Sequence, residues 1–213
     1  MGFLLFLAVA GVVVLVLTAV RSVVETGEQN ARFRSLKAAS AALDRHAREP
    51  GWRRVPDDED VPAGRMSEVH RTRHAAVAGT HAGRSVRVAV FAASTPTSTW
   101  QGVPVRRAVL LGLVLVVDVP ELRGNLVLNP IRGSRRYGVV GSLEPLLSGD
   151  TGTKVFAHLT SYEPPAVDIR DGVACLTFGD VDLVDQLDDL VALASYVVDL
   201  LVDVRRAAPL GED

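Results

Sequence analysis

The sequence predicts an α+β protein, in which an N-terminal transmembrane helix is followed by an antiparallel sheet that a long C-terminal amphipathic helix covers. Three observations lead to this prediction. Residues 1–20 carry no charged side chain, several segments between 84 and 178 alternate like strands, and residues 183–204 repeat apolar side chains at helical spacing. The 213 residues leave room for one modest domain beside the opening segment.

The opening segment predicts a retained membrane anchor. At about 1.5 Å per residue, a helix over Met1–Val20 reaches roughly 30 Å, the thickness of a bilayer's hydrocarbon core. A cleaved export signal should begin with positive charge and carry a shorter apolar run. Basic residues instead follow the segment, and the positive-inside rule then predicts an outer N-terminus and a cytoplasmic domain in a single-pass protein of the cell membrane. The first of these basic residues are Arg21, Arg32, Arg34 and Lys37.

Composition divides the chain into an anchor at 1–22, a juxtamembrane helix or linker at 23–51, an α+β domain at 52–206 and a disordered tail at 207–213. Helix formers dominate residues 28–48 and stop at the breakers Pro50 and Gly51. The thin apolar stripe of this helix is expected to rest on the membrane surface or on the domain. Its members are Phe33, Leu36, Leu43 and Ala47.

Period-2 alternation predicts the sheet. Residues 84–92 alternate as a strand and form a hairpin with the segment before them, whereas "STPTSTWQGVP" is expected to be a loop and "PDDEDVPAG" a solvated loop. The uncharged run Ala108–Val117 is too short for a second span and predicts a central strand buried on both faces. Residues 124–130 predict a further strand, and Asp171-Gly172 predicts a type I′ hairpin turn.

Helix signals gather near the C-terminus. Residues 142–148 predict a short helix that Pro145 limits to little more than one turn. The terminal helix has an N-cap at Gly179-Asp180, acidic residues in its first turn and Arg205 and Arg206 in its last. Its apolar stripe is expected to cover the sheet, because no other long helix is predicted. The stripe comprises Leu183, Leu187, Leu190, Ala194, Val197, Leu201 and Val204.

Charge is divided unevenly along the chain. Residues 21–143 hold 19 basic and 11 acidic side chains, whereas residues 144–213 hold 4 basic and 14 acidic ones. The two parts are expected to complement each other within one fold. Alternatively, the basic part next to a bilayer is drawn to anionic lipid.

Motifs for phosphate and metal binding are incomplete. "GTHAGRS" has three residues between its glycines and Arg84 where a phosphate-binding loop needs lysine. "HRTRH" spaces His70 and His74 like a zinc helix, but Arg71 replaces the general-base glutamate and nearby arginines repel a cation. The sequence therefore predicts neither a cofactor nor a metal.

Catalytic motifs are also missing. Cys175 is the single cysteine, so no intramolecular disulfide forms, and its pairing with His158 as nucleophile and base has no support beyond the presence of both residues. No G-x-S-x-G elbow, C-x-x-C pair or dinucleotide fingerprint occurs. No catalytic residue is predicted, and nucleic acid is not an expected partner.

The most tangible interaction candidate is the loop "NPIRGSRRYG". Arg132, Arg135 and Arg136 lie close together in it, with Tyr137 beside them. Guanidinium groups suit phosphate oxygens, so these arginines are candidates for contact with an anion or an anionic lipid. The alternative is a solvated surface loop.

The order of features resembles uncharacterised single-pass, membrane-anchored proteins of GC-rich Gram-positive bacteria. The resemblance rests on the apolar N-terminus, "PGW", "AGTHAGRSVRVAVF", "DVPELRGNLVLNP", "YGVVGS" and "RDGVACLTFGD", and it covers about residues 50–206. It implies a compact α+β domain without assigning a catalytic residue. The leading hypothesis is a membrane-tethered, non-catalytic module for protein interaction or scaffolding. The alternatives are a membrane-bound hydrolase or transferase with an unrecognised site, and an anionic-lipid sensor.

Overall fold

The computed structural model describes residues 30–64, 66, 71–100, 103–161 and 163–207, with side chains described outside 94–109. The chain divides into two compact units, Met1–Ser35 and Leu36–Asp213, and the α+β fold belongs to the second. Within the described residues, no helix combines the length and apolar character needed to cross a membrane. The expected anchor at 1–22 lies outside the described residues, and so does the expected tail at 207–213 except for Ala207, which ends a helix.

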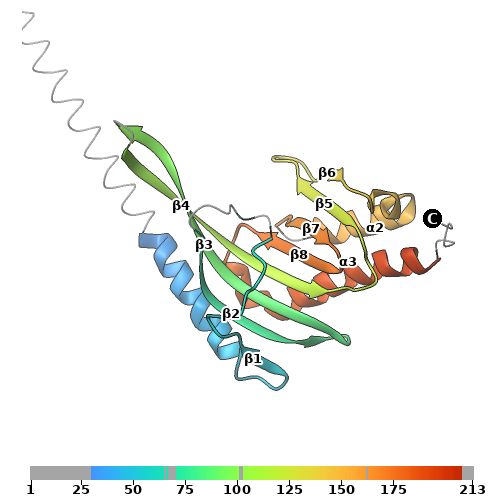
Figure 1. Cartoon of the computed structure of the whole chain (residues 1–213), viewed down its shortest axis with the longest axis horizontal. Coiled ribbons are helices and arrows are strands. Elements are labelled where there is room, and N and C mark those ends of the chain that lie inside the picture. The colour runs from blue at the N-terminus through green and yellow to red at the C-terminus, as the bar shows by residue number, and fades with distance from the viewer. Residues whose placement is uncertain (1–29, 65, 67–70, 101–102, 162, 208–213) are drawn as a thin grey trace, which may run out of the picture. The chain divides into compact units, whose positions relative to one another are not determined.

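Among the described residues, eight strands form one sheet in which every pair of neighbours is antiparallel, and this confirms the α+β class (Figure 1). Their order is β1-β2-β3-β4-β8-β7-β5-β6, so the late hairpin β7–β8 joins two earlier parts of the chain. β1 and β6 are the two edges. The strands are β1 Trp52–Arg54, β2 Arg71–His81, β3 Arg84–Trp100, β4 Val103–Asp118, β5 Asn125–Pro130, β6 Tyr137–Val140, β7 Ala166–Arg170 and β8 Val173–Phe178.

Helices cover one face of the sheet. Strand alternation directs Leu113, Leu115 and Val117 of β4 into a core shared with α3, Leu187–Ala207. The expected stripe of α3 is buried at its five central positions, which confirms its role as a cover. Those positions are Leu187, Leu190, Ala194, Val197 and Leu201.

Two further helices contribute to the same core. The helix over residues 30–46 buries Leu36, Ala39 and Leu43, so the compact unit begins at Leu36, whereas Phe33 is exposed. Helix α2, Asp150–Leu159, buries Val155 and Leu159. The first of these helices therefore packs on the domain, one of the two places expected for its stripe, and α2 is a cover that the sequence did not predict. The threonines and glycine of α2 are poor helix formers, and packing overrides their propensity.

The second face is covered in part by residues 55–64 and Met66. Val55, Val61 and Ala63 pack onto Phe91, Val116 and other side chains of β2, β3, β4 and β8. This corrects the prediction of a fully solvated loop at 56–64, although its acidic side chains do remain largely exposed. Gly64 permits the close approach, because a Cβ there would lie 2.4 Å from Thr177 Oγ1.

The β7–β8 hairpin confirms its predicted turn, whereas the β3–β4 hairpin differs from the prediction. Asp171 and Gly172 have φ of 44° and 88°, as a type I′ turn requires, and Arg170 pairs with Val173. Strands β3 and β4 pair as far as Trp100 and Val103, so the predicted loop at "STPTSTWQGVP" was wrong. Its threonines favour strands, and its prolines are tolerated because no third described strand pairs with β3 or β4 there.

Two short 3₁₀ helices complete the fold. Helix η1, Glu144–Leu147, has Pro145 near its start, which confirms the short helix predicted at 142–148. Helix η2, Asp182–Gln186, precedes α3, and Asp180 accepts the backbone N–H of Asp182 at 2.9 Å. The predicted N-cap residue therefore serves η2 rather than α3 itself.

Candidate functional site

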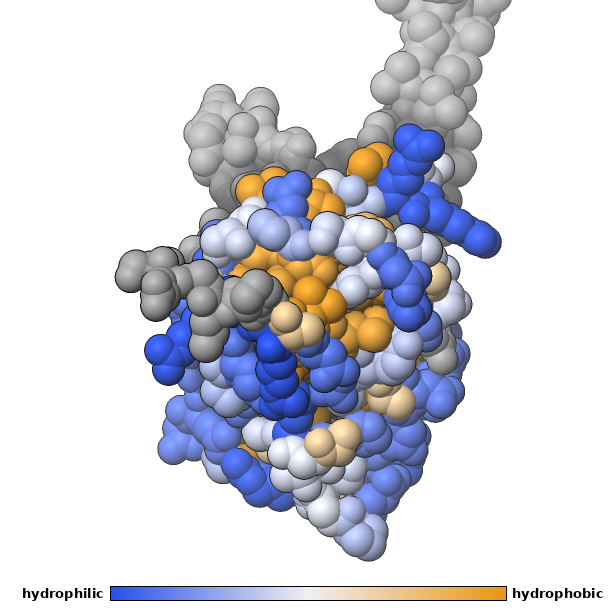
Figure 2. All heavy atoms as spheres, turned by 90° about the vertical axis from the view of Figure 1, so that its right-hand side faces the viewer, coloured by the Kyte–Doolittle hydropathy of each residue, from blue (hydrophilic) through white to orange (hydrophobic). Residues whose placement is uncertain are grey.

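A pocket of 690 Å³ lies beside the edge strand β6, and we name it the β6 groove. On the side of the domain that carries β5, β6 and α2 in Figure 1, apolar side chains gather in the middle of the surface and hydrophilic ones surround them (Figure 2). The groove combines four apolar walls with four small or polar positions. The groove residues are Val139, Pro145, Leu147, Phe156, Gly141, Ser142, Glu144 and Ser148.

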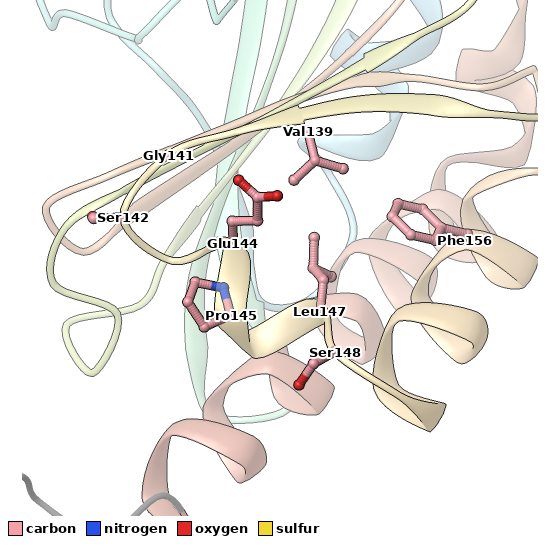
Figure 3. A pocket seen from close by; sticks show the side chains of 8 residues that line it. All are labelled: Val139, Gly141, Ser142, Glu144, Pro145, Leu147, Ser148 and Phe156. Carbon is pink, nitrogen blue, oxygen red and sulfur yellow. The ribbon is translucent and has the colours of Figure 1, made fainter.

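The sharp turn after β6 places η1 beneath the strand (Figure 3). Gly141 has φ of 139°, which L side chains rarely adopt. Asn125 secures the turn because its Oδ1 accepts the backbone N–H and the hydroxyl of Ser142, both at 2.9 Å. The Ser142 hydroxyl in turn accepts the backbone N–H of Asn125 at 3.0 Å. The lower wall of the groove is therefore held to the first residue of β5.

Helix α2 supplies the far wall through Phe156. The Phe156 ring stacks on Tyr137 of β6, with ring centroids 5.6 Å apart and an interplanar angle of 18°. Burial raises the pKa of Tyr137, and its hydroxyl finds no hydrogen-bond partner among the described residues. This stacked pair fixes the spacing between the strand and the helix.

The backbone of β6 is open on its outer side. Ile131 donates its backbone N–H to the carbonyl of Arg136 at 2.9 Å, which makes them a hydrogen-bonded pair. Because such pairs alternate along an antiparallel ladder, Gly138 and Val140 bond to β5. The N–H and C=O of Val139 therefore point to the open edge, while its side chain lines the groove.

The predicted arginine cluster lies at the turn between β5 and β6. Arg132, Arg135 and Arg136 are all exposed, and no described residue forms an ion pair with them. Gly133 gives the turn its positive φ of 76°. The cluster directly precedes Tyr137, whose ring stacks on Phe156 in the wall of the β6 groove.

Other arginines do have acidic partners. Arg84 contacts Asp199 of α3 at 2.9 Å and Glu121 at 3.1 Å, and Arg206 also contacts Glu121 at 3.1 Å. Arg84 and Asp199 come from the basic and acidic parts of the sequence, and therefore the two parts complement each other at this place.

A second pocket, of 360 Å³, is polar. It lies between residues 42–49 and 184–189, and carboxylates such as Asp185, Asp188 and Asp189 line it. The ring of His46 lies beside Trp52, and its Nδ1 lies 3.0 Å from the carboxylate Oε2 of Glu49. The Nε2 of His46 has no hydrogen-bond partner among the described residues. No group of three metal-binding side chains forms among the described residues.

The structure does not bring the considered catalytic residues together. His158 is exposed on α2, where its ring contacts Tyr196 of α3. Cys175 is buried with Val55, Val61 and Ala63 on the opposite face of the sheet, so the two cannot act as a nucleophile and base. His74 lies on β2, and His70 lies outside the described residues.

Cys175 is expected to resist thiol reagents in the folded protein. Burial is the main cause that raises its pKa to about 11 from 9.0, and the negative charge of Asp168 adds to it. At pH 8, this higher pKa lowers the thiolate population by roughly 100-fold. Labelling with iodoacetamide should therefore be at least that much slower in buffer than in 8 M urea. Equal rates would show that the cover over this face is open.

Sequence reasoning found the arginines but missed the groove. β6 is four residues long and α2 is rich in weak helix formers, so neither has a clear periodic signal. Gly141 after a short apolar run and Pro145 after it were the available signs of a sharp turn. The meeting of Val139 with Phe156 depends on how β6 and α2 pack.

The fold and the groove define an α+β domain with an open sheet edge. Comparisons with protein-family models, with curated proteins and with solved structures give no match for this chain. The resemblance to membrane-anchored proteins of GC-rich Gram-positive bacteria stays a prediction.

Proposed function

We propose that this chain is a single-pass membrane protein whose cytoplasmic domain is a non-catalytic module that binds a protein partner at the β6 groove. One observation carries the proposal: an edge strand with free backbone groups lies beside an apolar pocket. The uncharged segment at 2–20, followed by basic residues, supports the membrane tether.

Strand addition is the binding mode that fits this surface. An extended peptide that pairs with β6 gains main-chain hydrogen bonds, and alternate side chains enter pockets that provide specificity. Side chains directly opposite each other point to the same face of a sheet. The peptide residue opposite Val139 therefore points into the groove, between Leu147 and Phe156.

The chemistry of the groove favours binding over hydrolysis. Glu144 is its one ionisable side chain. Ser142, one of its two hydroxyl residues, is engaged with Asn125. A nucleophile activated by a neighbouring base would need a different arrangement. The groove therefore supports an interaction module rather than the hydrolase or transferase alternative.

Photo-crosslinking tests the interaction surface. Benzoylphenylalanine replaces Val140, which is 65% exposed on β6, or Tyr196, which is 42% exposed on α3, in the full chain in its native membrane. We expect a discrete protein adduct from position 140 alone. Val139→Pro removes the backbone N–H at the strand edge and should lower the yield of this adduct at least tenfold. Val139→Ala keeps that N–H and should lower the yield less. Identical adducts at both positions would refute the proposal.

The membrane tether has its own test. A C-terminal tag on the full chain should resist protease in intact spheroplasts and be digested once the membrane is permeabilised, because the domain is proposed to be cytoplasmic. Digestion of the tag in intact spheroplasts would overturn the orientation. Recovery of the chain in the soluble fraction would overturn the tether.

A further inference from the structure

We infer that the segment bound at the β6 groove is an extended peptide that is acidic at the end over the β5–β6 turn and apolar opposite Val139. The inference rests on the proposed function and specifies the chemistry of its partner. It follows from three features: the arginine cluster immediately precedes β6 in the chain, β6 is an edge strand, and Val139 of β6 lines the pocket.

The pocket defines the apolar position. Its walls at Val139, Leu147 and Phe156 come from three different elements, and its volume of 690 Å³ accommodates a large side chain. The paired residue of an added strand points to the same side as Val139. A leucine, methionine or aromatic residue at that position gains the apolar contact that fixes the peptide's register.

The arginine cluster defines the acidic end. Arg132, Arg135 and Arg136 lie immediately before β6 and have no ion-pair partner among the described residues. At the other edge of the sheet, by contrast, Arg53 contacts Glu59 at 3.3 Å and Arg54 contacts Asp44 at 3.4 Å. Guanidinium forks match carboxylates in geometry as well as charge. The cluster therefore offers positive charge that an acidic peptide end complements.

Glu144 makes the two ends of the site opposite in charge. It lines the groove beyond the C-terminal end of β6, whereas the arginines precede the N-terminal end. A carboxylate is therefore attracted over the turn and repelled near η1. A flat layer of anionic lipid would meet the arginines without using either the strand edge or the pocket, so the combined features favour a peptide.

Selection from a random heptapeptide library tests the inference. The full chain in non-ionic detergent is the bait, and binders that also bind Val139→Pro are discarded. We expect Asp and Glu to be enriched at least threefold at one end, with an apolar residue two to four positions away. The enrichment should vanish with the triple variant Arg132→Gln, Arg135→Gln and Arg136→Gln.

Affinity for the best selected peptide provides the matched control. The triple variant should weaken binding at least tenfold, and 0.5 M NaCl should weaken wild-type binding because the ion pairs are exposed. The double variant Arg53→Gln and Arg54→Gln removes exposed charge at the opposite edge and should change affinity less than twofold. Equal losses in the triple and double variants would overturn the inference.

The other outcomes separate the inference from the proposed function. Selected peptides that lose binding to the Val139→Pro variant but show no enrichment of Asp and Glu would overturn the inference. They would leave the proposed interaction site intact. Absence of any such binder would overturn the proposed function itself. Two further results would also overturn the inference. The first is arginine-dependent binding of the chain to phosphatidylglycerol vesicles while the selected peptides show no enrichment of Asp and Glu. The second is a dimer of the chain that Val139→Pro dissociates, because a second copy would then occupy the strand edge.

Discussion

Phe178→Ala is expected to lower the free energy of unfolding by about 3–5 kcal/mol, the usual cost of truncating a buried phenylalanine. Phe178 ends β8, pairs with Leu113 of β4, and is fully buried in the core beneath the helices. Because β8 joins β4 to β7, the cavity would form where the two parts of the sheet meet. A rigid core of this kind cannot fill the lost volume completely.

Urea unfolding of the full chain, followed by tryptophan fluorescence, measures this loss. Phe33→Ala is the matched control, because it removes the same side chain at a position that is 61% exposed. That variant should change stability by no more than about 0.5 kcal/mol. A loss below about 1.5 kcal/mol for Phe178→Ala would contradict the packing described for this face.

Gly141→Ala is expected to destabilise the domain by about 3 kcal/mol, because it combines backbone strain with a direct clash. A Cβ at this position would lie 2.3 Å from the carbonyl oxygen of Asn125 and 2.9 Å from Cα of Leu126. Both contacts are with backbone, which no rotamer change can relieve. The substitution should therefore also displace η1 and weaken partner binding at the β6 groove.

Gly133→Ala separates the two causes. Gly133 has a positive φ of 76°, yet a Cβ added to it would meet no atom within 4 Å. It should therefore show the conformational cost alone, about 1–2 kcal/mol. Equal losses of unfolding free energy for the two variants, measured in urea, would show that the clash at Gly141 is relieved by movement.

Local pattern was sufficient for the elements with strong periodicity. The run Ala108–Val117 predicts a central strand buried on both faces, and the structure buries Leu113–Val117 of β4 on both faces, whereas Leu110 is 50% exposed. Asp171-Gly172 set the register of β7 and β8, because the two strands are joined by a two-residue turn in which both residues have positive φ. The strand and the turn are confirmed because the signal and the structure lie in the same short stretch of chain, and the two-sided burial holds for the later half of the run.

Elements with weak local signals were missed. β1 and β6 are short edge strands of three and four residues, and α2 contains residues of low helix propensity. The coverage of the second face by Val61 and Ala63 was also missed, because prolines and acidic residues around them suggested a solvated loop. In each case, contacts with distant residues outweighed local preference.

The sequence by itself determined the class of the domain, its best strands, its terminal helix and the cluster of Arg132, Arg135 and Arg136. Only the tertiary structure decided that the strand after this cluster is an edge strand that lines an apolar groove. The groove needs Val139 on β6, Leu147 on η1 and Phe156 on α2 to meet. The walls of a pocket arise from packing between different helices and strands. The spacing of side chains along a single helix or strand does not predict that packing.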